Sequence, residues 1–378
     1  MNKIEKLLNE LCPNGVEFKS LGEVCEVVKG QQLNKNLLLE SGLYPVMNGG
    51  INPSGYWDTY NKNAQTITIS QGGASAGYVN FMQTPFWAGA HCYTIEKVVE
   101  FLNYKFVYYF LKNNQNNLIK SQYGAGIPAL NKTDIQNLQI PIPPLKIQEE
   151  IVKILDAFTE LEAELEAELE AELEARRRQY EYYRNKLLSF EYLKTNGGGY
   201  KLKMLGEVCE IYDKLRKPVA KDKRVKGDYP YYGANGIQDY VNNYLFEGEY
   251  LLIGEDGSVI NKDNSPVLHF VNGKFWVNNH AHIIQSKNHN LRFIYYALQC
   301  CNIFDLVKGT PPKLNQENLK IIQIPIPPLE VQEKIVSILD KFHALTTDLQ
   351  SGIPAEIEAR KKQYEYYRNQ LLTFKEAI

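Results

Sequence analysis

The sequence QIPIPPLKIQEEIVKILDAF at residues 139–158 returns as QIPIPPLEVQEKIVSILDKF at residues 323–342, 184 residues further along the chain. Two further pairs of matching stretches share this offset: LGEVCE at 21–26 and 205–210, and RRRQYEYYRNKLLSF at 176–190 with RKKQYEYYRNQLLTF at 360–374. Matches in one register do not arise by chance. The sequence therefore predicts a tandem duplication in which each half of the chain repeats one structural plan.

Between these repeated stretches the two halves diverge. TITISQGGASAGY (66–78) corresponds to YLLIGEDGSVI (250–260), and FWAGAHCYTI (86–95) corresponds to FWVNNHAHII (275–284) at a changed offset of 189. The scaffold is thus kept while the loops differ.

Each divergent part mixes strands and helices. The alternation in TITIS (66–70) predicts a half-buried strand, and FLNYKFVYYFLKN (101–113) and LRFIYYALQC (291–300) predict buried helices. Gly-rich turns such as NGGINPSGY (48–56) and YGANGIQDY (232–240) separate these elements. We therefore expect an α+β domain in each half, with a strongly twisted or barrel-like sheet.

A long helix is predicted after each of these domains. Proline fixes φ in QIPIPPL and disfavours helix at the residue before it, so the helices should begin near Lys146 and Glu330. Apolar residues then follow at spacings of three and four, which predicts one buried stripe per helix. The stripe positions are Ile147, Ile151, Leu155, Phe158 and Leu161 in the first copy, and Val331, Ile335, Leu339, Phe342 and Leu345 in the second.

The first helix continues as LEAELEAELEAELEAR at 161–176, a repeat of four residues. An α-helix turns every ~3.6 residues, so leucines four apart advance about 40° per unit and suit only a short piece of helix. Glutamates four apart repel one another, and the leucine row therefore needs a covering partner. We expect the row Leu161, Leu165, Leu169 and Leu173 to pack against its equivalent, Leu345, Leu349, Ile353 and Ile357. In the second copy Gly352 and Pro354 predict a kink or a short break.

These patterns predict an α+β protein with two mixed α/β domains separated by two long helices. The expected segments are 1–145 (first domain), 146–199 (central helix with linker), 200–329 (second domain) and 330–378 (C-terminal helix). Two equivalent halves most simply fold with a pseudo-twofold axis, so the helices should form an antiparallel coiled coil with one domain at each end. A helix from 146 to 190 would be roughly 65 Å long at about 1.5 Å per residue.

Composition narrows the class of protein. With 378 residues, 44% hydrophobic and 23% charged, the chain should be globular with two domains or more. The N-terminal MNKIEKLLNELCPNG lacks an apolar signal core, and no run of about 18 apolar residues occurs, so we expect a cytoplasmic protein without a membrane partner. Six cysteines form no C-x-x-C pair, which argues against a metal site. A net charge of −2 does not by itself indicate a nucleic-acid partner.

The sequence shows no catalytic motif. G-x-x-x-x-G-K-[ST], H-E-x-x-H, G-x-S-x-G and a clean dinucleotide fingerprint are all absent, so no catalytic residue is assigned. His91 and His280 occupy matching places, but a single histidine in each domain beside Trp87 or Trp276 is more often a structural, hydrogen-bonded residue.

Recognition is the remaining function. KSQYGAGIPALNK (120–132) and VKGTPPKLNQENL (307–319) combine Lys, Gly and amide or hydroxyl side chains before a helix. Such groups bind phosphate oxygens. The alternative is an ordinary polar turn leading into QIPIPPL.

The order of these features closely resembles the specificity subunit of type I restriction-modification systems. The resemblance rests on the order of a globular part followed by a QIPIPPL-x-x-Q-E helix, which occurs twice. It rests also on the short repeats in the first helix, on QYEYYRN in both helices, and on LCPNGVEFKSLGEV (11–24). It spans the whole chain. Asn52-Pro53-Ser54 falls short of the N-P-P-[FY] motif of adenine methyltransferases, as a chain that only reads DNA should.

The resemblance implies that each domain is a target recognition domain that reads one half of a bipartite, asymmetric sequence in double-stranded DNA. The helices would set the spacer and dock two modification subunits. Those subunits would carry S-adenosylmethionine and methylate adenine, and restriction subunits would add ATP- and Mg-dependent translocation and cleavage. This chain would hold no cofactor and no activity of its own.

Two sets of candidate residues follow. The candidates for DNA binding are Gln71, His91, Lys120, Ser121, Tyr123, Asn131 and Lys132 in the first half, and Ser258, His280, Lys308, Thr310, Lys313 and Asn315 in the second. The candidates for binding modification subunits lie in QYEYYRN, where Tyr and Arg are typical of interface hot spots: Gln179, Tyr180, Tyr183, Arg184, Gln363, Tyr364, Tyr367 and Arg368. Alternatively, these tyrosines pack against the neighbouring domain.

Two other functions compete with this prediction. A self-sufficient restriction or methylation enzyme would need a few hundred further residues for its catalytic domains. A non-catalytic scaffold with two heads that bind a protein or another ligand is the second alternative, and the near-neutral charge is its best support.

Overall fold

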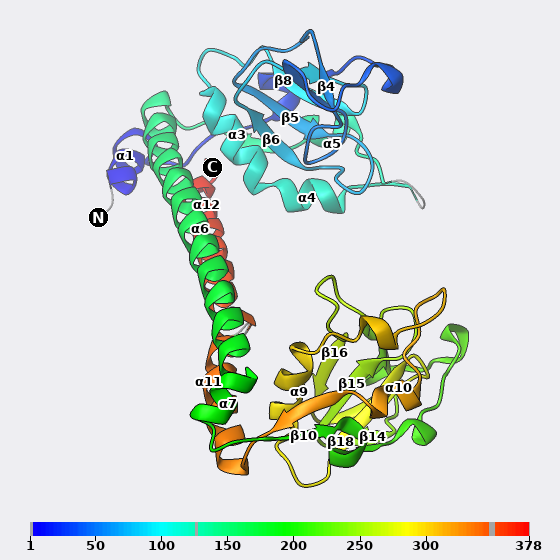
Figure 1. Ribbon diagram of the computed structural model, residues 1–378. Coiled ribbons are helices and arrows are strands. Elements are labelled where there is room, and N and C mark those ends of the chain that lie inside the picture. Colours follow the sequence, from blue (N-terminus) through cyan, green and yellow to red (C-terminus); the bar gives the residue numbers. More distant parts are fainter. Residues whose placement is uncertain (1–2, 125–127, 348–351, 378) are drawn as a thin grey trace. The chain divides into compact units, whose positions relative to one another are not determined.

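A computed structural model describes residues 3–124, 128–347 and 352–377 (Figure 1). The chain divides into two compact units, Met1–Glu168 with Ile357–Ile378 (unit 1), and Leu169–Glu356 (unit 2). A similar succession of elements recurs in both units, with an additional strand in the second, which confirms the predicted tandem duplication and the α+β class.

Unit 1 is built on an antiparallel sheet with strand order β2-β8-β5-β6, beside a smaller sheet with order β4-β3-β7 and a ribbon of β1 and β9. Its strands are β1 (Phe18–Ser20), β2 (Glu26–Lys29), β3 (Tyr44–Met47), β4 (Tyr56–Trp57), β5 (Thr66–Ser70), β6 (Val79–Met82), β7 (Trp87–Ala88), β8 (Cys92–Glu96) and β9 (Gln139–Pro141). Its helices are α1 (Lys3–Leu11), α2 (Leu21–Val24), η1 (Lys35–Leu37), α3 (Tyr104–Asn113), α4 (Gln115–Lys120) and α5 (Lys132–Gln136). Helix α3 matches the predicted buried helix at 101–113.

Strand β5 was predicted to be half-buried, and that prediction is wrong. Ile67 and Ile69 on one face belong to the main core of unit 1, but Thr68 and Ser70 on the other face are also buried. Their strand partners place Met82 and Cys92 on that second face, where a smaller apolar cluster covers it. An alternating pattern shows which side chains are polar, but not whether other residues cover the polar face of the strand. It therefore did not predict the apolar cluster on the second face of β5.

Unit 2 repeats this plan with strand orders β11-β18-β15-β16 and β13-β12-β17-β14, and a ribbon of β10 and β19. Its strands are β10 (Lys201–Met204), β11 (Cys209–Ile211), β12 (Lys226–Gly233), β13 (Gly236–Val241), β14 (Phe246–Glu247), β15 (Tyr250–Gly254), β16 (Leu268–Val271), β17 (Lys274–Val277), β18 (Ala281–Ser286) and β19 (Gln323–Ile326). Its helices include α7 (Phe190–Thr195), α8 (Leu205–Val208), η2 (Asp213–Leu215), η3 (Lys221–Lys223), α9 (Leu291–Gln299), η4 (Phe304–Leu306) and α10 (Gln316–Lys320). In the part of the chain that the structure describes, each unit contains separate sheets of two to four strands and no single closed barrel.

The long helices form antiparallel pairs inside each unit, as predicted. Helix α6 (Leu145–Leu187) contributes its first part to unit 1, where it pairs with α12 (Ile353–Leu372). The contacts there run in opposite directions: Phe158 meets Tyr367, Thr159 meets Tyr364, and Glu166 meets Lys361. The rest of α6 pairs in unit 2 with α11 (Leu329–Thr347), where Tyr180 lies beside His343 and Tyr183 beside Phe342.

The leucine row of the LEAE repeat is covered only in part, which corrects the prediction. Leu161 is 60% exposed, whereas Leu169 is buried. Because the row turns away from the seam by about 40° per unit, glutamates enter the seam in its place. Glu166 pairs with Lys361 at 2.6 Å, and burial raises the pKa of Glu162, to which the Glu166 charge also contributes.

Gly352 is not helical and α12 begins directly after it, at Ile353, which agrees with the predicted kink or short break; residues 348–351 lie outside the described residues. Leu349, which was predicted to join the packed row, lies outside the described residues. Among the described residues no helix is both long enough and apolar enough to cross a membrane.

Candidate functional site

The end of strand β5 carries the first group of predicted recognition residues. The backbone N–H of Gln71 donates to the carbonyl of His91 at 2.8 Å, and the carbonyl of Gln71 accepts from the N–H of Leu130 at 2.8 Å. Two residues on, the N–H of Gly73 donates to the carbonyl of Pro128 at 2.9 Å. Three segments that lie far apart in the sequence therefore meet at one place.

A short hairpin completes this group in unit 1. Tyr123 and Ala129 exchange two backbone hydrogen bonds of 2.9 Å, and the tips of Tyr123 and His91 are exposed. Residues 125–127, which belong to the predicted recognition stretch, lie outside the described residues.

Unit 2 builds the same frame with different side chains. The N–H of Glu255 donates to the carbonyl of His280 at 2.8 Å, and the N–H of Leu314 donates to the carbonyl of Glu255 at 2.8 Å. The N–H of Gly257 donates to the carbonyl of Pro312 at 3.0 Å. These are the three hydrogen bonds of unit 1 at corresponding positions, so the frame is a property of the repeated plan.

The hairpin of unit 2 spans residues 308–313. Lys308 and Lys313 exchange backbone hydrogen bonds of 2.9 and 2.8 Å, and Lys308, Thr310 and Lys313 are all exposed. The imidazole Nδ1 of His280 lies 3.0 Å from Oδ1 of Asp256, at the strand end beside the hairpin. The structure thus brings His280 close to the hairpin residues. The sequence had made them candidates only from their positions along the chain.

The remaining candidates flank the two hairpins. Several of their polar groups serve the backbone: the Ser121 hydroxyl donates to the carbonyl of Asn117 at 2.9 Å, and Asn315 caps α10 by accepting from the N–H of Asn318 at 2.7 Å. Lys120 ends α4, Asn131 and Lys132 begin α5, and Ser258 lies half-buried after Gly257.

A cluster of charged side chains at the base of the second hairpin was missed by the sequence reasoning. Nδ1 of His282 lies 2.6 Å from Oδ2 of Asp213, and its Nε2 lies 2.8 Å from the carbonyl of Leu314. Arg216 donates to Glu255 at 2.5 Å and approaches Oδ2 of Asp213 to 3.6 Å. The side chains of Asp213, Arg216, Glu255 and His282 are only 8%, 11%, 14% and 1% exposed. The motif FWVNNHAHII contains His282, but nothing in the sequence joins it to Asp213.

This cluster supplies its own counter-charge. Burial opposes ionisation of Asp213, but the hydrogen bond from His282 and the charge of Arg216 outweigh it, so the pKa of Asp213 lies below its usual value. Asp213, Glu255 and His282 bring three potential metal-ligand atoms within 4.8 Å of one another. The guanidinium of Arg216 pairs with both carboxylates, which is the role that a cation would otherwise fill.

The QYEYYRN residues of unit 2 face their own unit. The Tyr180 hydroxyl donates to Oε1 of Gln299 at 2.8 Å, Arg184 donates to the same oxygen at 3.3 Å, and burial raises the pKa of Tyr180 to about 12. Tyr183 stacks on Phe342. Gln179 accepts from Arg176.

The equivalent residues of unit 1 behave alike. Tyr364 shares a 2.8 Å hydrogen bond with Thr159, Tyr367 packs on Phe158, and Arg368 donates to Oδ1 of Asn113 at 3.3 Å. Gln363 accepts from Arg360. Arg368 thus contacts the neighbouring domain, whereas Tyr364 and Tyr367 pack against helix α6 and not, as the alternative had them, against the domain.

Tyr367, which the sequence reasoning selected, is 44% exposed. The most exposed rings of the two motifs are Tyr182 and Tyr366, which it did not select. They are 58% and 59% exposed, and each packs edge-on against the next tyrosine, Tyr183 or Tyr367. Each unit therefore carries a run of three aromatic rings from the helix seam to the surface, which we name the aromatic ladder: Phe342, Tyr183 and Tyr182 in unit 2, and Phe158, Tyr367 and Tyr366 in unit 1.

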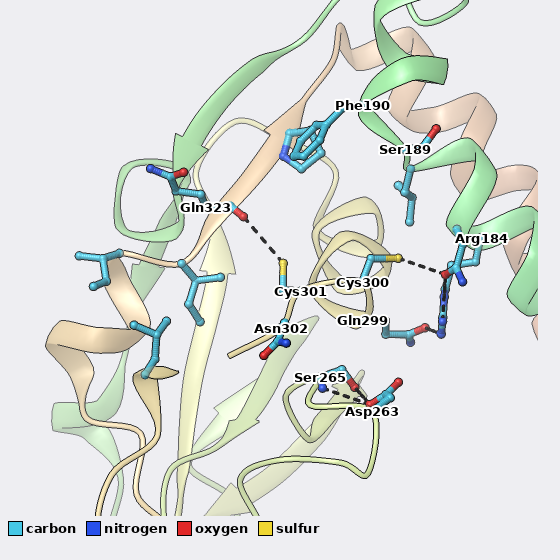
Figure 2. Close-up of a pocket in the computed structure, with 16 residues that line it drawn as sticks. Arg184, Ser189, Phe190, Asp263, Ser265, Gln299, Cys300, Cys301, Asn302 and Gln323 are labelled. Carbon is cyan, nitrogen blue, oxygen red and sulfur yellow. Dashed lines mark hydrogen bonds between the residues drawn. The ribbon is translucent and has the colours of Figure 1, made fainter. Parts of the chain in front are cut away.

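A cavity of about 800 Å³ lies beside Arg184 in unit 2 (Figure 2). The Cys300 thiol lies 3.7 Å from Oδ1 of Asn185, and Figure 2 shows the Cys301 thiol directed toward Gln323. Burial raises the pKa of both thiols, to about 12 for Cys301, so neither is a ready nucleophile. The cavity offers no reactive group, and Asp263 at its rim is engaged by Ser265.

Comparison with known proteins places the whole chain among DNA specificity proteins. A family model described as the type I restriction modification DNA specificity domain matches twice, at residues 13–175 and 198–359. A putative type I restriction enzyme specificity subunit of Haemophilus influenzae is 46% identical over 98% of this chain and 98% of its own length. A putative type I specificity subunit of Mycoplasma pneumoniae is 34% identical over 64% of this chain and 98% of its own length.

Solved structures share the fold. A chain from a structure on complex assembly and conformational transition of the type I R-M system superposes with a TM-score of 0.65 at 18% identity, covering 95% of this chain and 98% of that one. The S subunit of a type I restriction-modification system from M. genitalium gives a TM-score of 0.50 at 23% identity, covering 95% and 96%.

Proposed function

Because this chain belongs to the family of type I restriction-modification DNA specificity proteins, we propose that each of its two units reads one half of a bipartite, asymmetric DNA sequence. The protein is the DNA-recognising subunit of such a system and is not itself the catalyst. The assignment of one half-site to each unit is our inference from its duplicated structure.

One observation carries this proposal: the two units hold their hairpins on the same three backbone hydrogen bonds but present different side chains from them. Unit 1 presents the exposed side chains of His91 and Tyr123, whereas unit 2 presents those of Lys308 and Lys313. Backbone-held loops with variable tips suit the reading of base edges, since each base pair offers its own pattern of donors and acceptors in the major groove. Different tips on one frame therefore read different half-sites.

Phosphate contacts would come from the lysines around each hairpin. Lys120 and Lys132 flank the hairpin of unit 1, and Lys308 and Lys313 form the base of the hairpin in unit 2. A net charge of −2 leaves few such contacts, so partner subunits would supply further neutralisation of the duplex.

The partner subunits would carry the chemistry. Modification subunits would bind S-adenosylmethionine and methylate adenine, and restriction subunits would use ATP and Mg for translocation and cleavage. The two matching aromatic ladders support two modification subunits per chain, one docked on each unit. Such a complex would act on DNA in the cytoplasm.

The docking surface would centre on the outer rings of the ladders. Tyr182 and Tyr366 are exposed aromatic rings held upright by a neighbouring ring, and a ring held in place loses little conformational entropy when a partner covers it. Tyr180 and Tyr364 would act indirectly, by fixing the helix on its own unit.

The test is co-expression of the full chain with its modification subunit in a host without adenine methylation, followed by mapping of methylated adenines in the genome. The expected result is one bipartite motif with a fixed unread spacer. A complex that forms and binds S-adenosylmethionine but modifies no motif would overturn the proposal in favour of the scaffold that binds another ligand.

A further inference from the structure

The two hairpins are held by the same three backbone hydrogen bonds, but different side chains support them. In unit 2 the residue directly after strand β15 is Glu255, and His282 contacts the carbonyl of Leu314, the leucine directly after the hairpin. In unit 1 the corresponding positions hold Gln71 and Tyr93, both neutral at physiological pH. The frame is thus supported by buried charge in one unit and by neutral groups in the other.

The register of the sheets extends this comparison. Tyr212 N–H donates to the carbonyl of Ile283, which sets Asp213 opposite His282. In unit 1, Lys29 of β2 pairs with Tyr93 of β8 at that place. Where unit 2 has a buried carboxylate, unit 1 has an exposed lysine.

The charged cluster contacts the hairpin of unit 2 at its C-terminal end. His282 reaches the carbonyl of Leu314, the residue directly after the hairpin, at 2.8 Å, whereas the Tyr93 hydroxyl reaches the equivalent carbonyl of Leu130 at 3.4 Å. On either side, Lys313 lies 3.6 Å from Glu255, and Gln316 donates to Asp213 at 3.2 Å.

Burying charged groups is costly unless each is paired, and removing one member leaves its partner unpaired in the interior. The hairpin itself is exposed and is held mainly by backbone bonds at its base, so it is free to shift if that base loosens. The cluster therefore lies where a change in its charge would act on the base of an exposed loop.

We propose that Asp213, Arg216, Glu255 and His282 form a positioning cluster that fixes the hairpin 308–313 of unit 2, so that this unit depends on buried charge to read its half-site while unit 1 does not. The four residues act through the hairpin and do not touch the DNA. The step from hairpin position to half-site reading rests on the proposed function; the step from the cluster to hairpin position does not.

The first experiment therefore measures the hairpin without DNA. Amide hydrogen exchange is followed in the full chain for wild type and for Asp213→Asn, which keeps the shape of the side chain but removes its charge. We expect roughly tenfold faster exchange in residues 308–316, and no change in β15 and β16 or in the hairpin of unit 1. Lys29→Gln, at the corresponding place in unit 1, is the matched control and should leave both hairpins unchanged.

Two results would overturn the positioning role. One is unchanged exchange in residues 308–316. The other is faster exchange throughout unit 2, because the cluster would then support the whole unit and not its hairpin. If Asp213→Asn does not fold, Glu255→Gln takes its place, since it installs the residue that unit 1 uses at this position and leaves the backbone hydrogen bonds in place.

The second experiment repeats the methylation mapping with the same variants. We expect one half of the motif to stay unchanged and the other to lose roughly tenfold in discrimination at one or more positions, the scale of a mismatched base pair. Relaxation of both halves, or of neither, would refute the link to reading. A wild-type complex that modifies no motif would instead count against the proposed function. The hydrogen-exchange result would still test the positioning of the hairpin, because it does not depend on DNA.

Discussion

Tyr183 stacks on Phe342 with ring centroids 5.4 Å apart and ring planes inclined by 21°. The residues 184 positions away, Tyr367 and Phe158, make the matching contact in unit 1 at 5.9 Å. In each unit the tyrosine comes from one copy of the repeat and the phenylalanine from the other. Each helix pair is therefore completed by an exchange between the two copies, and the QYEYYRN motif serves packing before it serves any partner.

The outer rings of the aromatic ladders should carry partner binding. Replacing Tyr182 and Tyr366 together with Ala removes the two most exposed rings but leaves the Tyr183–Phe342 and Tyr367–Phe158 contacts in place. We expect the affinity for the modification subunit to fall by tenfold or more, since exposed aromatic anchors at interfaces are worth about 2 kcal/mol or more. Isothermal titration with the purified modification subunit measures this loss.

Phe190→Ala provides the control for that variant. Phe190 is also an exposed aromatic residue and stacks on Tyr200, but it lies outside the ladders. Its replacement should leave the affinity unchanged. An equal loss of affinity in the control and in the double variant would mean that the ladders are not the docking surface.

A buried glutamine joins each domain to its long helix. Gln148 accepts from the N–H of Asn103 at the start of α3 at 2.7 Å, and it donates to the carbonyl of Pro143 at 2.6 Å. Gln332 makes the same two kinds of hydrogen bond in unit 2. This explains the glutamine of the QIPIPPL-x-x-Q-E motif: it satisfies backbone groups that proline-rich and helix-capping segments leave without partners.

Gln148→Leu should therefore destabilise unit 1. The substitution fills similar space but leaves a buried N–H and a buried carbonyl unsatisfied, at a cost of about 1–3 kcal/mol for each group. Urea unfolding should show a lower free energy of unfolding, and Gln332→Leu should do the same in unit 2. Glu149→Gln, on the neighbouring exposed residue, should have almost no effect. A loss in Gln148→Leu no larger than in this control would contradict the role.

Sequence reasoning predicted the features that periodicity and repetition encode. The duplication, α3, α9, the antiparallel helix pairing and the break near Gly352 all follow from spacing within the chain. It did not predict the cluster around Asp213 and His282, because the two residues are 69 positions apart and meet only through the strand order. It also passed over the two most exposed rings of the motifs, Tyr182 and Tyr366, since a helical pattern identifies a stripe but not what lies against it.

Lys112 should make the stability of unit 1 depend on pH. It donates to the carbonyl of Val79 and to Gln115, and burial, with a further contribution from the charge of Arg368, lowers the pKa of Lys112 to about 8. Between that pKa and about 10.4 the unfolded chain keeps a proton that the folded chain has lost. The free energy of unfolding should therefore rise as pH increases from about 8 toward 10.

Urea unfolding at several pH values, across a window of about 2.5 pH units around the shifted pKa, tests this. Lys112→Met, which retains the aliphatic stem but cannot titrate, should flatten the rise. Lys105, on the same helix and paired with Asp156, provides the matched replacement Lys105→Met, which should leave the rise in place. A rise that persists in Lys112→Met would assign it to another group.

The LEAE repeat should set the length of the unread spacer between the half-sites. Deleting residues 166–169 removes one repeat, keeps the pattern in phase so that Leu173 takes the place of Leu169, and shortens α6 by about 6 Å. Base pairs follow one another at about 3.4 Å, so the spacer of the methylated motif should change by one or two base pairs while both half-sites stay the same. Glu170→Gln, which alters a charge in the repeat but not its length, should leave the spacer unchanged. An unaltered spacer in the deletion variant, with the complex still assembled and active, would show that the repeat is not the ruler and that the spacing is determined elsewhere in the complex.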